Sequence, residues 1–250
     1  LCPAWTGCHR VQTPVPAQRP ADKSPNEHTL HPDSSWEGYL QRLPRRQGPI
    51  LDFRGRPVAD QEKHAALLLF DVGSRDLQQC ADALIRLRAE YLFERGRHEE
   101  IVFAFTSGHR YRWNDYRRGI RPRINGATVS FTQQSAPCPP SPEALRRYLD
   151  IVYTYAGTIS LARTLRPVRS LEIGTVILKS GSPGHCCIVI DKALQEGRWV
   201  YQLAEGYTPA QTIYVLKNPR TGTPWHELGT GPIQTASYRF DTYQLCRFGP

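Results

Sequence analysis

The 250-residue chain has no methionine, and it lacks several patterns that mark common protein classes. No apolar run approaches the ~20 residues of a membrane-spanning helix, so we expect no segment to cross a bilayer. The seven cysteines include no C-x-x-C pair, which argues against a structural zinc site. They are also too few and too irregularly spaced for a disulfide scaffold. Without an initiator methionine, we expect the gene product to begin before Leu1.

Positive charge is plentiful, with a net charge of +9 and a pI of about 9.4. Such a balance favours anionic surroundings, such as a cell-wall polymer, anionic lipid or nucleic acid. The basic residues are scattered, however, and the densest stretch, residues 110–123, interleaves six arginines with three aromatic residues. This pattern also suits sugar binding or a solvated loop. We therefore predict no nucleic-acid partner.

Composition divides the chain into three regions. Residues 1–8 are typical of a signal-peptide remnant, and Thr6-Gly7-Cys8 resembles a lipobox, although Trp5 departs from the usual aliphatic residue. Cys8 is therefore the lipidation candidate, and an ordinary secretory signal is the alternative. Residues 9–33 are poor in large apolar residues and predict a disordered tether. Residues 34–250 predict a single α+β domain, held at a membrane surface by the acyl chain and the basic charge.

Hydrophobic periodicity predicts long helices packed on an antiparallel sheet, an α+β fold. Ser35 is a helix cap before Trp36, and long helices are expected over 76–94 and 143–163. The run AALLLFDV predicts a buried strand over 65–72. Further short strands are expected at 101–105, 128–132, 175–178, 186–191, 199–203, 212–216 and 238–240.

Three residues could form a nucleophilic site. Cys80 lies near a helix start, where the dipole and free N–H groups stabilise a thiolate. His185 opens a strand after Gly184, as suits a general base, and Glu205 on the next strand could orient it, with Gln202 in reserve. The structural alternatives are a core cysteine opposed by nearby carboxylates and a histidine that caps a turn. The arrangement is the one that papain-like hydrolases use.

Side chains around these residues are candidate substrate contacts. Exposed aromatic rings stack on sugars, although core burial of Trp113 is an equal alternative. The candidates are Trp113, Tyr116, Gln202, Tyr207 and Gln211. A metal site built from His64, Asp71, His185 and Glu205 lacks any H-x-x-x-H spacing, so we predict neither a metal nor a cofactor.

Several blocks carry a resemblance to a known family. They are DLQQCADALIRLRAEYLF from Asp76, YAGTISL from Tyr155, SPGH followed by IVID, PAQ-TIYVLKNP from Pro209, and TPWH from Thr223. Over residues 36–248 the chain resembles the bacterial domain of unknown function 4846 family. The resemblance implies an exported, often lipid-anchored protein, and it brings no established activity.

A more local similarity covers residues 174–207, which look like the strand–histidine–strand block of CHAP-type and NlpC-type cell-wall amidases. It implies a papain-like core. The chain departs from the family's usual residues in three places: Thr175 stands for Asp, Cys186-Cys187 for Ala-Val, and Glu205 for Gln. The last exchange keeps a hydrogen-bond acceptor for histidine and adds a charge.

Two functions follow as expectations. The first is an exported thiol hydrolase of cell-wall peptide or amide bonds, with Cys80 as nucleophile, His185 as base and Glu205 as the orienting group. The alternative is a non-catalytic envelope module that binds glycan or a partner protein through the same cleft. In both, the partner is a cell-wall polymer or peptide and the location is periplasmic or outer-membrane-associated.

Overall fold

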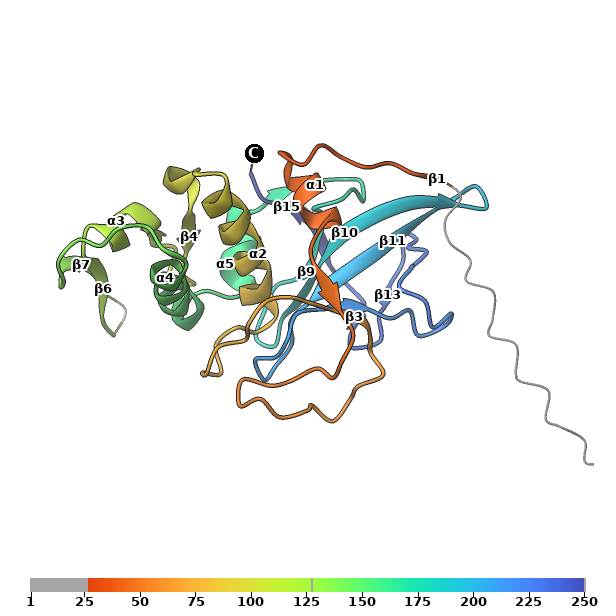
Figure 1. Cartoon of the computed structure of the whole chain (residues 1–250), viewed down its shortest axis with the longest axis horizontal. Helices are drawn as coiled ribbons and strands as arrows, with labels where there is room; N and C mark the ends of the chain where they lie inside the picture. The colour runs from red at the N-terminus through yellow and green to blue at the C-terminus, as the bar shows by residue number, and fades with distance from the viewer. Residues whose placement is uncertain (1–26, 127, 250) are drawn as a thin grey trace, which may run out of the picture.

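The computed structural model describes residues 27–126 and 128–249, and a nine-stranded antiparallel sheet dominates it (Figure 1). Its main path runs β2-β3-β12-β11-β10-β9-β15-β8, and β1 pairs with β10. In chain order the strands are β1 Glu27–His28, β2 Arg45–Arg46, β3 His64–Leu68, β8 Arg166–Pro167, β9 Val176–Lys179, β10 His185–Gln195, β11 Arg198–Glu205, β12 Tyr214–Leu216 and β15 Gln244–Arg247.

The remaining elements are short helices, two longer helices and three small hairpins. The helices are α1 Trp36–Gln41, α2 Cys80–Glu94, the 3-10 turn η1 His98–Glu100, α3 Trp113–Arg117, α4 Pro142–Tyr155 and α5 Thr158–Thr164. The hairpins pair β4 Val102–Ala104 with β5 Arg110–Arg112, β6 Ile120–Asn125 with β7 Thr128–Gln133, and β13 Ile233–Gln234 with β14 Arg239–Phe240. In Figure 1, α2 lies between the large sheet and the part that holds α3, α4 and the β6–β7 hairpin.

The expected fold class, long helices packed on a sheet around a papain-like core, is wrong. The structure is sheet-rich, with 31% of the described residues in strands and 23% in helices. The helix expected over 143–163 breaks at Ala156 and Gly157 into α4 and α5, and the helix expected from Asp76 begins only at Cys80. The sheet is larger than expected because β10 and β11 extend to 11 and 8 residues and because β15, β8 and β1 join it.

Most of the expected strands exist, with shifted bounds. The strand expected over 65–72 is β3, which ends at Leu68 because Leu69 turns outward and is 51% exposed. The predicted Ser35 cap is confirmed, since its Oγ accepts a hydrogen bond from the Gly38 N–H at 2.9 Å. None of the described helices has the length and apolarity that crossing a bilayer requires.

The last residues of the segment expected as a tether, 9–33, include a short strand. Glu27 and His28 form β1, which pairs antiparallel with β10 opposite Leu194 and Ala193. The His28 ring also lies 2.7 Å from the Asp191 carboxylate. Main-chain hydrogen bonds and this side-chain contact therefore attach the segment to the sheet, and residues 1–26, including Cys8, lie outside the described part of the chain.

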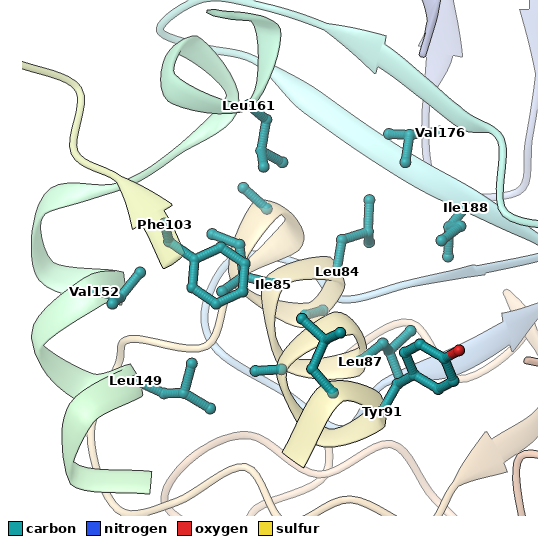
Figure 2. Packing of buried hydrophobic residues seen from close by; sticks show 14 of the residues in the cluster. Leu84, Ile85, Leu87, Tyr91, Phe103, Leu149, Val152, Leu161, Val176 and Ile188 are labelled. Carbon is teal, nitrogen blue, oxygen red and sulfur yellow. The ribbon is translucent and has the colours of Figure 1, made fainter. Parts of the chain in front are cut away.

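Helix α2 is the centre of the main hydrophobic cluster. Figure 2 shows Leu84 and Leu87 of α2 surrounded by Leu149 and Val152 of α4 on one side and by strand residues such as Ile188 on the other. A helix that is apolar on most of its circumference is stable only when it is covered on several sides. A second cluster, which includes Cys187 and Val189, covers the opposite face of the sheet. Cys186 and Cys187 thus face opposite ways, as the strand alternation predicts.

The first turn of α2 meets the end of β11 at Gly206. A Cβ atom at Gly206 would lie 2.8 Å from Ala83 Cβ and 2.9 Å from the Gln79 carbonyl oxygen. Real Cβ atoms do not approach backbone so closely, so the missing side chain lets the helix start lie directly against the strand end. This contact brings Cys80, the first residue of α2, beside the residues at the ends of β10 and β11.

We expect Gly206→Ala to destabilise the protein by about 1–3 kcal/mol, because overpacking a tight contact forces the backbone apart. Urea unfolding measures the change. Gly229→Ala is the matched control, since nothing lies within 4 Å of its added Cβ, and its stability should stay within about 0.5 kcal/mol of the unsubstituted protein. Equal stability of the two variants would contradict the close contact.

Candidate active site

Cys80 is the first residue of α2 and lies in the wall of a cavity of about 470 Å³. The Asp82 Oδ2 atom accepts a hydrogen bond of 3.2 Å from the Gln79 N–H, which fixes the start of the helix at this point. The first N–H groups of a helix have no carbonyl partner within it, and they carry the positive end of its dipole. The expected position of the cysteine at a helix start is therefore confirmed.

His185 begins β10 and is 3% exposed. Its Nε2 atom lies 2.8 Å from Glu205 Oε2, and the Tyr214 hydroxyl donates a hydrogen bond of 2.5 Å to Glu205 Oε1. Glu205 and Tyr214 are cross-strand partners in the β11–β12 pair, so the register of the sheet sets this geometry. Both carboxylate oxygens are satisfied, and the ring is held in one orientation with Nδ1 left for another partner.

Close packing holds the histidine from its other sides. The residue before it, Gly184, leaves no room for a side chain, since a Cβ atom there would lie 2.2 Å from Thr158 Oγ1. The ring of Tyr238 lies 4.6 Å from the His185 ring, and that of Tyr207 lies 5.2 Å away at a steep angle. The glycine therefore serves the packing of α5 against the strand entrance.

The Cys80 thiol and the His185 ring affect each other's protonation, and their pKa values move in opposite directions. A hydrogen bond from the Cys186 thiol lowers the pKa of Cys80 most; burial opposes it, and the hydrogen bond and charge of His185 lower it further, to about 5. Burial lowers the pKa of His185, but hydrogen bonds to Cys80 and Glu205 outweigh it and raise this pKa to about 9. Between these two values the pair is a thiolate and an imidazolium.

The nearby carboxylates were expected to oppose a thiolate, and the structure limits that effect. Asp82 is buried, and desolvation raises the pKa of its carboxyl well above the ordinary value, which favours the neutral form. The Cys186 thiol remains protonated, because its hydrogen bond to Cys80 and its burial raise its pKa well above the ordinary value. Cys186 therefore acts as a donor to the thiolate of Cys80.

The five expected substrate contacts lie in different surroundings. Trp113 is fully buried and stacks on the nearly buried Tyr116 ring at 5.5 Å, in the core beside α4, so neither offers a free face to a ligand. Gln202 is buried and accepts a hydrogen bond from Arg45 at 2.7 Å. Gln211 is 1% exposed. Of the five, the structure brings Tyr207 to the site, as a half-buried neighbour of the His185 ring.

Three residues that sequence reasoning missed contribute to the site: Tyr214, Cys186 and Tyr238. Tyr214 lies in an expected strand, but only the register with β11 reveals that it faces Glu205. Cys186 lies in an expected strand and directly follows the candidate histidine. That adjacency was the available signal.

Among residues 27–126 and 128–249, no three His, Cys, Asp or Glu side chains gather in a way that would hold a metal ion. The His64 ring nitrogens contact the carbonyl oxygens of Gln61 and Gly48. Asp71 pairs with Arg86 at 2.9 Å. These two residues therefore have other partners.

Fold and site together define a protein with a Cys–His–Glu constellation at the ends of two central strands of a large antiparallel sheet. The chain belongs to the family described as domain of unknown function 4846, whose profile matches residues 22–247. The resemblance found in the sequence is thereby confirmed. No curated protein and no solved structure matches the chain.

We expect iodoacetamide to alkylate Cys80 in the folded protein with a pH midpoint of about 5. The reactive form is the thiolate, so the rate should rise as pH increases through this value and be high at neutrality. Mass spectrometry of the alkylated peptide measures it. His185→Ala should shift the midpoint upward, because the imidazolium that stabilises the thiolate is gone. Labelling only after denaturation would contradict the site geometry.

Cys186→Ala should also raise the pKa of Cys80, because it removes the hydrogen bond that lowers this pKa most. Alanine leaves only a small cavity, at a cost of about 1–2 kcal/mol of stability. Cys187→Ala is the matched control, since Cys187 is equally buried on the opposite face of the sheet. An unchanged alkylation profile in Cys186→Ala would exclude the thiol–thiolate contact.

Proposed function

We propose that this protein is an exported thiol hydrolase that cleaves peptide or amide bonds of the cell wall. The observation that supports it best is the reciprocal pair: a cysteine with a lowered pKa and a histidine with a raised pKa, the latter hydrogen-bonded to a buried glutamate. Structural cysteines buried in apolar cores show raised pKa values instead, as Cys246 does at about 12.

Acylation begins with the thiolate of Cys80. Its sulfur attacks the carbonyl carbon of the amide, the C=O electrons move to oxygen, and a tetrahedral oxyanion forms. The N–H groups at the start of α2, which have no carbonyl partner within the helix, are suited to stabilise that oxyanion. As the intermediate collapses, the C–N bond breaks and the His185 imidazolium donates its proton to the departing amine. A thioester on Cys80 and neutral His185 remain.

Deacylation uses the neutral imidazole as a general base. It removes a proton from water, whose oxygen attacks the thioester carbonyl carbon, and the C–S bond then breaks. The products are a carboxylic acid and the thiolate, with His185 protonated again. Glu205 stabilises the imidazolium and fixes the ring through Nε2, so that Nδ1 serves the reacting atoms.

Charge and composition support the cell-wall substrate and the exported location. The net charge of +9 favours residence at an anionic polymer, and the sequence around Cys8 has the composition of a signal-peptide end. Lipid anchoring through Cys8 is part of the same proposal. The substrate class expected is therefore a peptide or amide of the bacterial wall.

Cys80→Ala should abolish the release of new amino groups from purified peptidoglycan fragments, measured by mass spectrometry of the products. Glu205→Gln should lower kcat by roughly 10²- to 10⁴-fold, because the histidine loses the charge that stabilises its protonated form. KM should change much less, since Glu205 lies behind the ring and is fully buried.

Cys138→Ala is the matched control, being a free, half-buried cysteine in another part of the chain. It should retain full activity. If Cys80→Ala binds peptidoglycan as the unsubstituted protein does, and no amine appears with either protein, the hydrolase proposal fails and a binding module is favoured.

A further inference from the structure

Lys63 is a buried lysine to which the reaction proposed above gives no role. It directly precedes β3 and is 6% exposed, although lysine is among the residues that proteins bury least. Its carbonyl oxygen accepts a hydrogen bond of 2.9 Å from the Lys217 N–H, which fixes the backbone against the end of β12. An enclosed ammonium group costs free energy unless other groups compensate its charge, so its neighbours are informative.

The Lys63 ammonium lies over two tyrosine rings of the candidate site. Its Nζ atom is 4.6 Å from the ring centroid of Tyr207 and 5.3 Å from that of Tyr214. Such distances are typical of cation–π contacts. The Tyr207 ring is a neighbour of the His185 ring, and the Tyr214 hydroxyl donates to Glu205. The lysine therefore contacts the residues that surround the histidine–glutamate pair.

Glu205 supplies the main negative charge that acts on this ammonium. Burial lowers the pKa of Lys63, and the charges of Glu205 and then Asp60 oppose that shift. Asp60 is exposed, so solvent screens its charge, whereas Glu205 is fully buried. His226 also feels the charge of Glu205, but burial lowers its pKa, which favours the neutral ring. The lysine is therefore suited to compensate the carboxylate that contacts His185.

The proposed reaction leaves the same excess of charge at each stage. Before attack, the Cys80 thiolate, the His185 imidazolium and the Glu205 carboxylate together carry one negative charge in excess. In the thioester, His185 is neutral, and the carboxylate again leaves one negative charge. The ammonium of Lys63 balances this excess in both states. A buried set of groups without net charge avoids the free-energy cost of an uncompensated ion.

We propose that Lys63 is the counter-ion of Glu205 and a positioning residue of the proposed hydrolase. Its ammonium group, held over the two tyrosine rings, stabilises the carboxylate that orients His185, and through that pair it favours the thiolate of Cys80. Lys63 is not among the described residues that line the cavity beside Cys80, so it acts on the site and not on the substrate. This role rests on the proposed function, because it supports the residues of that same site.

Lys63→Met tests the charge, because methionine keeps an unbranched and flexible side chain. Without the ammonium the set of groups takes up a proton more easily. The pH midpoint of Cys80 alkylation should therefore rise from about 5 by roughly one pH unit. Lys63→Arg should keep the midpoint near that of the unsubstituted protein, because arginine retains the charge and stacks on aromatic rings. Loss of packing alone would not produce this difference between the two variants.

Lys192→Met is the matched control. Lys192 also lies over an aromatic ring, with its Nζ atom 4.1 Å from the Trp199 centroid, and it pairs with Glu172 at 2.9 Å. It belongs to β10 but lies roughly 23 Å from His185 along the strand. The substitution removes one positive charge and one cation–π contact, and the alkylation midpoint of Cys80 should stay unchanged.

A double-mutant cycle with Glu205→Gln tests whether the lysine acts through the glutamate. With Glu205 present, Lys63→Met removes the counter-ion of a buried carboxylate and should lower the urea midpoint of unfolding. In the Glu205→Gln background the ammonium has no carboxylate to balance. The same substitution should then leave the urea midpoint unchanged or raise it. If Lys63→Met alone does not fold, a folded double variant supports the proposal.

The outcomes separate the two proposals. An alkylation midpoint that does not move in Lys63→Met, or a loss of stability that is equal with and without Glu205→Gln, overturns the counter-ion role alone. A midpoint that rises equally in Lys192→Met also overturns it, in favour of the net charge of the chain. Failure of both Lys63→Met and the double variant to fold overturns it in favour of packing. Absence of amine release by the unsubstituted protein overturns the hydrolase proposal instead, and the double-mutant cycle still decides the role of Lys63.

Discussion

The buried contact between His185 and Glu205 is the interaction on which the site depends. The glutamate is fully buried, and its two oxygens are occupied by the His185 ring and the Tyr214 hydroxyl. Burying a carboxylate is costly unless such partners compensate. The same partners orient the histidine and raise its pKa, which in turn favours the thiolate of Cys80. Through the His185 ring, the hydrogen-bonded Glu205 carboxylate therefore favours the thiolate form of Cys80.

Hydrophobic packing of α2 places Cys80 near His185. Helix α2 is enclosed by the sheet on one side and by α4 on the other, so its position is set by apolar contacts along its length (Figure 2). Gly206 then permits the first turn to touch the end of β11. The sheet provides the histidine, the glutamate and the tyrosine through hydrogen-bonded register, and the helix provides the nucleophile. The cavity lies where the start of the helix meets the segment that precedes β10.

Local sequence signals were sufficient for the catalytic candidates and insufficient for the fold. Cys80, His185 and Glu205 could be chosen because helix starts, strand entrances and the following strand have recognisable residue patterns. The extent of the sheet could not be predicted, because β15 and β1 join it through pairings between distant segments that leave no periodic signal. Trp113 illustrates a related limit: an aromatic residue among arginines looks exposed, yet it is fully buried, and burial depends on the tertiary contacts of α4.

The pKa of the Cys80 thiol is the most direct test of the central claim that helix and sheet together create a reactive thiolate. The thiolate absorbance of the folded protein, taken as the difference from Cys80→Ser, should titrate at about 5. A difference signal that titrates near the ordinary thiol value of 9.0 would mean that neither His185 nor Cys186 acts on the sulfur, and it would contradict the account.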